Sequence, residues 1–217
     1  KDQSYFLFSL RQEQLKRALT PLGRMSKPEI RDIARKLGLK VADKADSQEI
    51  CFVPGQDYKA FLRTHMGAEK FHRGGIYDRD GNFIAPHDGI EMFTIGQRKG
   101  LPGGSAQPRY VIDIDAETSR VIVGSAEELL VDEFEVERVN WSLGRTEARS
   151  SKCTVKIRYN HPGAHAAIVP VDRERCRVRL REPQRAITPG QAAVFYDGDL
   201  VLGGGWICRQ AALVPAA

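Results

Sequence analysis

The chain has 217 residues, of which 41% are hydrophobic and 28% are charged, and its net charge is +5 at pH 7. This composition excludes a disordered chain and predicts one or two folded domains with substantial cores. It contains no apolar run long enough to cross a bilayer and no signal-type start, so we expect no membrane partner and a cytoplasmic location.

The N-terminal region is interpreted as the end of a larger unit. The first residue is Lys1 and the first methionine is Met25, so we expect a fragment or a cleaved product. Ser9 and Gln12 have capping-box spacing, and an apolar stripe follows as far as Gly23, which predicts a helix.

A second helix is predicted from clear start and stop signals. Ser26 is its expected N-cap, Glu29 lies three residues later, and Gly38 ends it. We expect its apolar stripe to be buried, namely Ile30, Ile33, Ala34 and Leu37. Both helices are typical of an α/β unit whose strands lie mostly outside this chain.

A lone cysteine, Cys51, follows the second helix, between a polar run and a short apolar segment that ends at Pro54. A cysteine is a nucleophile only as the thiolate, and the adjacent acids Asp46 and Glu49 oppose ionisation. Local chemistry therefore leaves two readings open, a small buried hydrophobe or a reactive thiol.

The spacing of the four cysteines predicts no metal site. The cysteines are Cys51, Cys153, Cys176 and Cys208. None of them forms a CxxC pair, the spacing that is usual for zinc ligands. Scattered thiols without a secretory signal favour a reducing cytoplasm.

A third short helix is predicted over residues 57–66, and beyond it the hydrophobic period changes to alternation. A hairpin is expected over residues 74–84, and a second strand pair over residues 110–123. The acidic stretch 126–133 is interpreted as a surface connection and a domain boundary.

The stretch 96–104 between these strand pairs holds five glycines together with Arg98 and Lys99. This composition predicts a flexible cationic loop. It is not a phosphate-binding P-loop, because the GxxxxGK[ST] spacing is absent.

Only strands are predicted from Phe134 to the end, at a spacing that indicates a closed barrel of six strands. Alternation over residues 153–159 predicts Lys156 and Arg158 on one face and Tyr159 on the other, with Val155 and Ile157. Three arginines alternate over residues 176–181 in the same way.

Positive charge is concentrated between Arg145 and Arg185, where eleven Lys/Arg and four acids give a balance of +7. A basic face of this kind suits a polyphosphate partner, bound in a salt-dependent way. The alternative is an ordinary solvated face of a β domain.

Several motifs in order along the chain give it a resemblance to the tRNA-specific 2-thiouridylases. They are KDQSYFL at 1–7, DSQ at 46–48 followed by Ile50-Cys51-Phe52, TIGQRKGL at 94–101, VKIRY at 155–159, TPGQAAVFY at 188–196 and LGGG at 202–205. Glu49 departs from the residue types common in that family.

The resemblance implies an α+β, mostly β protein in three parts. Residues 1–57 would be the C-terminal part of an ATP-pyrophosphatase (PP-loop) domain, 58–132 a small central β-rich domain, and 133–217 a tRNA-binding six-stranded β-barrel. The phosphate loop and a first catalytic cysteine would lie in the missing part of the first domain.

The resemblance also implies a reaction, the ATP-dependent 2-thiolation of the wobble uridine U34. ATP, with Mg²⁺ as its expected companion, is bound by the missing domain and activates the uracil 2-oxygen. A persulfide carried on Cys51 and loaded by a sulfur-relay donor protein supplies the sulfur, and the other cysteine closes a disulfide. We expect a sulfurtransferase that is a monomer, and we expect this fragment to be inactive alone.

RNA contacts are implied by the same motifs. We expect the anticodon stem-loop of tRNA to be contacted by Lys1, Asp2, Gln3, Arg158, Tyr159 and Gln191. On electrostatic grounds alone, and not from the motifs, we expect Arg98 and Lys99 to contact the RNA backbone. Two alternatives stay open: a stand-alone RNA-binding module without catalytic activity, and an unrelated cysteine hydrolase that would use His65, His72 or His87 beside Cys51.

Overall fold

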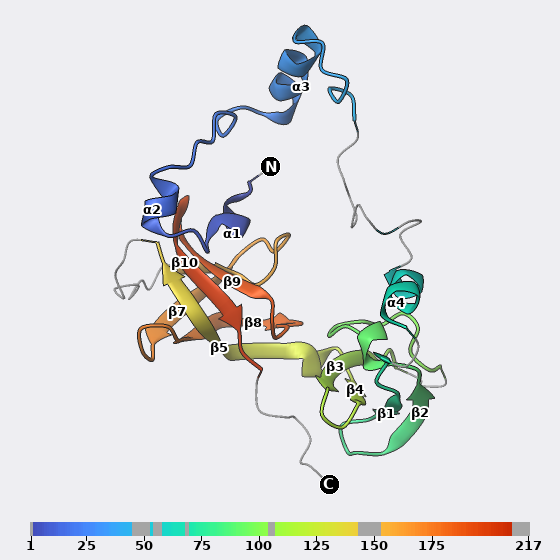
Figure 1. The fold of residues 1–217 in the computed structure, drawn as a ribbon. Helices are drawn as coiled ribbons and strands as arrows, with labels where there is room; N and C mark the ends of the chain where they lie inside the picture. The colour runs from blue at the N-terminus through green and yellow to red at the C-terminus, as the bar shows by residue number, and fades with distance from the viewer. Residues whose placement is uncertain are drawn as a thin grey trace.

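The computed structural model describes residues 2–44, 53, 58–67, 70–103, 107–142 and 153–209. Cys51 and Lys1 lie outside the described residues, as do Arg145, Arg149 and Lys152 of the basic stretch. The expected fold class is confirmed: the chain is mostly strands, with a few N-terminal helices, a central sheet and a closed six-stranded barrel (Figure 1).

The N-terminal region forms three short helices, α1 (Ser4–Leu7), α2 (Gln12–Leu15) and α3 (Lys27–Lys36). The helix predicted from Ser9 to Gly23 was too long, because a single turn, α2, forms there. Its capping box joins Arg11 and Gln14 rather than Ser9 and Gln12.

Helix α3 begins at the predicted capping box of Ser26 and Glu29 and is followed by Gly38, at φ +66°. Its apolar stripe, however, is not buried as expected, since Ile33 is 37% and Leu37 68% exposed. The helix lies apart from both β domains (Figure 1), and none of the hydrophobic clusters found among the described residues includes a residue of this stripe. None of the described helices is long and apolar enough to cross a membrane.

The central domain combines α4 (Tyr58–Met66) with a four-stranded sheet in the order β2-β1-β4-β3. The predicted hairpin forms from β1 (Gly74–Tyr77) and β2 (Phe83–His87), and the second pair from β3 (Tyr110–Asp115) and β4 (Arg120–Gly124). Strands β1 and β4 are parallel. Consecutive apolar residues in β4 face opposite sides, so both faces of this sheet contribute to a core.

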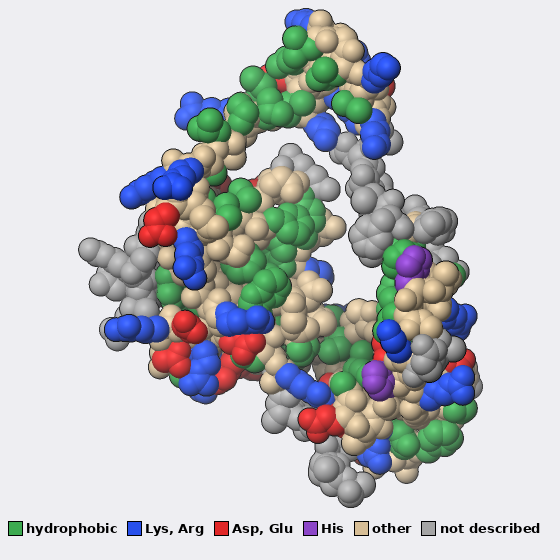
Figure 2. Space-filling model, in the orientation of Figure 1, with side chains coloured by type: hydrophobic (Ala, Val, Ile, Leu, Met, Phe, Trp, Pro, Cys, Tyr) green, Lys and Arg blue, Asp and Glu red, His purple; other side chains and the backbone are tan. Residues whose placement is uncertain are grey.

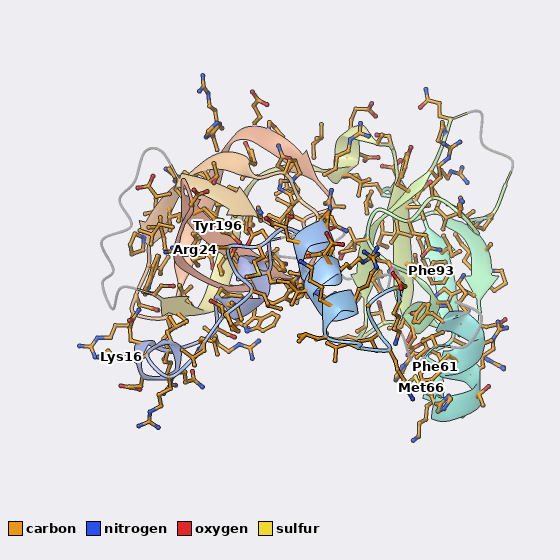
Figure 3. All side chains as sticks on the ribbon, turned by 90° about the horizontal axis from the view of Figure 1, so that it is seen from above. Lys16, Arg24, Phe61, Met66, Phe93 and Tyr196 are labelled. Atoms are coloured by element: carbon orange, nitrogen blue, oxygen red, sulfur yellow. The ribbon has the colours of Figure 1, made fainter. Side chains whose placement is uncertain are left out.

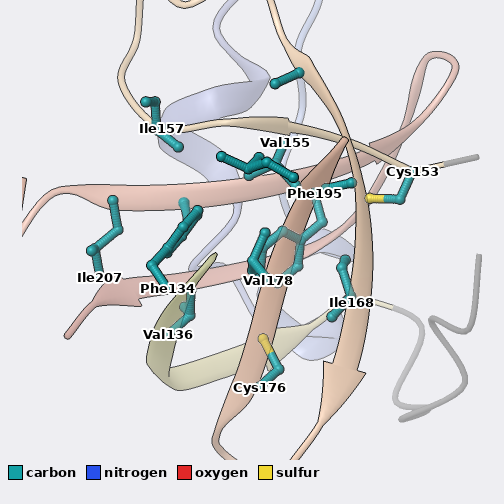
Figure 4. Close-up of a cluster of buried hydrophobic side chains, with 14 of the residues drawn as sticks. Phe134, Val136, Cys153, Val155, Ile157, Ile168, Cys176, Val178, Phe195 and Ile207 are labelled. Atoms are coloured by element: carbon teal, nitrogen blue, oxygen red, sulfur yellow. The ribbon is translucent and has the colours of Figure 1, made fainter. Parts of the chain in front are cut away.

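Six antiparallel strands close the C-terminal barrel in the order β10-β5-β8-β7-β6-β9. They are β5 (Leu130–Trp141), β6 (Cys153–Lys156), β7 (Ala164–Pro170), β8 (Cys176–Arg185), β9 (Ala192–Asp197) and β10 (Leu200–Ile207). Alternate residues point inward, and Phe134, Val178 and Phe195 are among the fully buried residues that fill the interior (Figure 4). Closure leaves no free edge among the described strands of this domain.

The two β domains are joined without a linker. Leu129 ends a 3-10 turn, η4 (Glu127–Leu129), and is buried in the core of the central domain, while Val131 packs against the barrel core. Strand β5 starts between them and runs out of the central domain into the barrel (Figure 1). The surface connection expected over residues 126–133 was therefore wrong, because half of that stretch is strand and Leu129 is buried.

Candidate nucleic-acid interface

Helix α1 is docked on the outside of the barrel. Tyr5 and Phe8 are each 6% exposed and pack with Val194 and Tyr196 of β9. The hydroxyl of Tyr5 donates a hydrogen bond of 2.9 Å to the carbonyl of Ala192, and burial raises the pKa of this phenol to about 12. The aromatic run near the N-terminus is thus an anchor that attaches the first residues of the chain to the last domain.

The absence of a side chain at Gly204 makes this docking possible. A Cβ atom there would lie 2.8 Å from the Phe8 ring, closer than real contacts allow. Asn140 holds the same segment from the opposite side, since its amide donates to the carbonyls of Phe8 and Leu10 at 2.7 and 3.0 Å. The LGGG motif is thereby explained in part by the packing of α1.

A polar network lies beside this apolar contact. Gln3 donates from Nε2 to the hydroxyl of Tyr159 at 2.9 Å, and Lys156 Nζ lies 3.6 Å from Asp2 Oδ2. The Ser4 hydroxyl donates to Asp2 at 2.9 Å, so the Tyr196 hydroxyl, 3.2 Å from Ser4 Oγ, is the donor in that pair. The structure therefore brings Asp2 and Gln3 together with Tyr159.

The charges of this network are held in defined states. Hydrogen bonds from the Ser4 backbone and side chain lower the pKa of Asp2, with Lys156 adding to the effect. Lys156 also lies 5.0 Å from the centre of the Tyr196 ring, within cation–π range. Burial raises the pKa of Tyr196, so its phenol remains a hydrogen-bond donor.

The side chain of Tyr159 does not lie on the face that the predicted alternation assigned to it. Strand β6 ends at Lys156 and the chain bends, so that Tyr159 does not point inward with Val155 and Ile157. Instead it joins the outer cluster around Tyr5, with its ring 6.0 Å from the Tyr5 ring. Alternation predicted the wrong face because the strand ends at Lys156, three residues before Tyr159.

Arg158 precedes Tyr159 in this bend. Its side chain is exposed and forms no ion pair with any described residue. It is therefore an exposed cation one residue before Tyr159, which belongs to the aromatic cluster.

Two arginines of β8, Arg177 and Arg179, differ from Arg158 because acids of β5 face them. The strand register places Glu133 opposite Arg179 and Glu135 opposite Arg177. Arg179 Nε lies 2.5 Å from Glu133, and Arg177 Nη2 lies 3.0 Å from Glu135. The balance of +7 counted along residues 145–185 overstates the charge of this surface, and acidic and basic side chains are seen intermixed on the molecule (Figure 2).

The other expected RNA contacts are spread over two domains. Gln191 is exposed in the turn that precedes β9, one residue before the carbonyl that Tyr5 binds. Arg98 and Lys99 are exposed on the central domain, in a loop fixed by Gln97, whose side chain accepts from the Thr94 backbone and donates to that of Lys99. This loop is not brought next to Tyr159, and Figure 3 shows Tyr196 and Phe93 in separate parts of the molecule.

The histidines considered for a hydrolase are all engaged. His65 Nδ1 contacts the Phe61 carbonyl at 2.9 Å, and His72 lies 2.5 Å from Glu91. His87 accepts from the Gly89 backbone and donates to the Ser119 carbonyl. The remaining described cysteines, Cys153, Cys176 and Cys208, are free thiols.

Sequence reasoning missed three members of the interface. Lys156 and Tyr196 are brought to this network only by the fold, whereas Ser4 lies two residues after Asp2 and binds it locally. A usable signal was their position inside the matching motifs, since each lies within a few residues of one of the expected RNA contacts.

Comparison with known families is consistent with this arrangement of domains. A tRNA methyl transferase HUP domain model matches residues 1–55, a tRNA methyl transferase PRC-barrel domain model matches 59–125, and an aminomethyltransferase beta-barrel domain model matches 131–207. The chain is thus of the class in which a HUP-type segment, a PRC-barrel and a second β-barrel follow one another.

Curated relatives define the family more narrowly. The chain is 49% identical over 208 residues to the tRNA-specific 2-thiouridylase MnmA of Geobacter metallireducens, covering 95% of this chain and 56% of the relative. It is also 49% identical to MnmA 1 of Caldanaerobacter subterraneus, over 97% of this chain and 57% of the relative. The chain belongs to the tRNA-specific 2-thiouridylase family, and it spans just over half the length of these relatives.

Proposed function

We propose that this chain is the tRNA-binding and sulfur-carrying part of a tRNA 2-thiouridylase, a sulfurtransferase that replaces the 2-oxygen of the wobble uridine U34 with sulfur. The observation that supports this most directly is the docking of α1 on the barrel. It joins Gln3 to Tyr159 beside the exposed cation of Arg158. A phosphate-pairing cation next to aromatic rings and an amide is the combination that single-stranded RNA loops bind.

Cys51 is the proposed carrier of the sulfur, as a persulfide loaded by a donor protein. The terminal sulfur of that persulfide attacks C2 of the uracil, and the activated 2-oxygen leaves with the electrons of its bond to C2. The thiolate of a second cysteine of the longer protein then attacks Sγ of Cys51, so that the sulfur–sulfur bond breaks, a disulfide forms between the two cysteines and the transferred sulfur stays on C2.

ATP and its Mg²⁺ are assigned to a part of the protein outside this chain. The sequence contains no Ser-Gly-Gly-x-Asp loop, and the chain spans 56% of the Geobacter relative. In this proposal the residues described here therefore bind and orient tRNA, and none of them contacts ATP. A cytoplasmic monomer with the domain limits 1–57, 58–132 and 133–217 completes the proposal.

The test uses the longer protein and a Cys51→Ser variant. Thiolation of tRNA should be abolished while tRNA affinity stays within about twofold, because sulfur chemistry needs a thiolate and binding depends on other surfaces. Mass spectrometry of nucleosides from the treated tRNA measures the product. Thiouridine at the wild-type yield would rule out Cys51 as the carrier, and binding without any thiolation by the unmodified longer protein would favour the RNA-binding module.

A further inference from the structure

Phe6 is an exposed aromatic residue at the centre of the interface that the expected RNA contacts do not include. It lies on α1, one residue after Tyr5 and two before Phe8 in the sequence, and both of these are buried, yet 56% of Phe6 is exposed. Hydrophobic side chains gather on the barrel face where α1 lies (Figure 2). Single exposed apolar residues are common, so exposure alone assigns no role to Phe6.

The ring of Phe6 is held in a fixed orientation by two other rings. Its centroid lies 4.7 Å from that of Tyr159, with the planes tilted by 34°, and it meets Tyr5 edge-on at 5.4 Å. Tyr159 is fixed by Gln3, and the backbone N–H of Phe6 donates to the carbonyl of Gln3 at 3.0 Å. A ring that is already ordered loses little conformational entropy when a ligand covers it.

Cations lie beside this ring stack. Arg158, the residue before Tyr159, is exposed and forms no ion pair with any described residue, and Lys156 belongs to the network around Asp2. An exposed, rigid aromatic face next to an available arginine suits a planar ligand attached to a phosphate. A nucleotide with an unpaired base has both features, whereas an apolar protein segment would leave the arginine without a partner.

We propose that Phe6 is a base-stacking residue, on whose exposed face an unpaired nucleobase of the bound RNA stacks. The inference rests on the proposed function and names a residue through which the chain distinguishes unpaired from paired RNA. Bases inside a duplex cannot reach such a face, so Phe6 contributes to the binding of loops and not of helical stems.

The experiment compares Phe6→Leu with wild type on two RNAs, an anticodon stem-loop and a fully paired duplex with the same number of phosphates, at one salt concentration. Loss of the ring should weaken stem-loop binding by about 5- to 140-fold, the range that corresponds to one stacked base, and leave duplex binding unchanged. Phe6→Trp should restore stem-loop affinity, because indole offers a larger stacking face.

Phe83 provides the matched control. It is 60% exposed on β2 of the central domain and meets Tyr77 edge-on, so Phe83→Leu removes an equivalent ring far from α1. This variant should bind both RNAs like wild type.

The other outcomes separate a failure of the Phe6 inference from a failure of the proposed function. Phe6→Leu with wild-type stem-loop affinity would overturn the inference and leave the proposed function standing. An equal loss on both RNAs, not restored by Phe6→Trp, would also overturn it, since displacement of α1 would then be the cause. If wild-type protein binds neither RNA, the proposed function itself fails.

Discussion

Gln3 and Tyr159 are 156 positions apart in the sequence and are joined by a hydrogen bond of 2.9 Å. The first belongs to the segment matched by the HUP domain model and the second to the segment matched by the beta-barrel model. The expected RNA contacts at the two ends of the chain are therefore parts of one surface.

The ring and the hydroxyl of Tyr159 should contribute differently to tRNA binding. Tyr159→Ala removes the ring and should weaken binding by about 1–3 kcal/mol, the usual contribution of one base stack. Tyr159→Phe removes only the acceptor of Gln3 and should keep most of the affinity. Titration of both variants with tRNA measures the two effects, and equal losses would show that the ring stacks on no base.

Arg158 should contact a phosphate, whereas Arg179 should not. Arg158→Ala is expected to weaken binding to all tRNAs and to reduce the slope of log K against log salt by about one. Arg179 is already paired with Glu133, so Arg179→Ala should change the slope much less. Affinities measured over a series of salt concentrations test this. The prediction fails if the two variants have the same slope.

The three described cysteines should differ in reactivity. Burial raises the pKa of Cys153 to about 11 and of Cys176 to about 12, and both are fully buried, whereas Cys208 is partly exposed. Alkylation of the folded Cys51→Ser variant should therefore modify Cys208 first, because the exposed thiolate is the reactive form. Peptide mass spectrometry identifies the site, and denatured protein, in which all three should react, is the control.

His161 should make stability fall at acidic pH. It is 5% exposed, its Nδ1 accepts from the Gly163 backbone at 3.1 Å, and its Nε2 lies 3.2 Å from the Gln184 side-chain oxygen. Burial lowers the pKa of this ring below its ordinary value of 6.5, so below that pH the unfolded chain binds a proton that the folded ring does not. The stabilising contribution is present above pH 6.5 and is lost as the pH falls.

Urea unfolding of wild type and His161→Gln between pH 5 and 8 checks this sign. The variant should be less stable at pH 7.5 and should depend less on pH. His87 has the same bonding pattern and a pKa that burial also lowers, so it contributes to stability in the same direction as His161. A wild-type free energy of unfolding that rises as the pH is lowered from 7 to 5 would therefore contradict the prediction.

Local patterns were sufficient to predict most of the β structure. Alternation and turn glycines identified the hairpin around Gly81 and the strand that starts at Cys176, because a period of two and a positive φ are properties of neighbouring residues. The pairing of Arg177 with Glu135 depends instead on the register of two strands, which a charge count along the sequence does not contain.

The site itself was accessible only through the family resemblance. Nothing local to Gln3 indicates that it contacts Tyr159, and the bend after Lys156 interrupts the alternation that would have placed the tyrosine inside the barrel. In the sequence Phe6 is one residue of an apolar run, and nothing sets it apart, since its exposure depends on how the docked Tyr5 and Phe8 orient α1.

The junction at strand β5 has a consequence for the proposed binding of RNA, because it fixes how the two β domains are placed. The first residue of β5, Leu130, is paired with Arg185 in the barrel and follows directly after Leu129 of the central core, and Arg209, just beyond β10, pairs with Asp115 of β3 at 3.3 Å, so the two domains are held together at this junction. The loop of Arg98 and Lys99 and the ring stack of Tyr159 are thereby kept at one separation and orientation. Under the proposed function, an RNA that touches both must present its backbone and its unpaired bases across that fixed interval, so the relative placement of the two domains would select RNAs by shape.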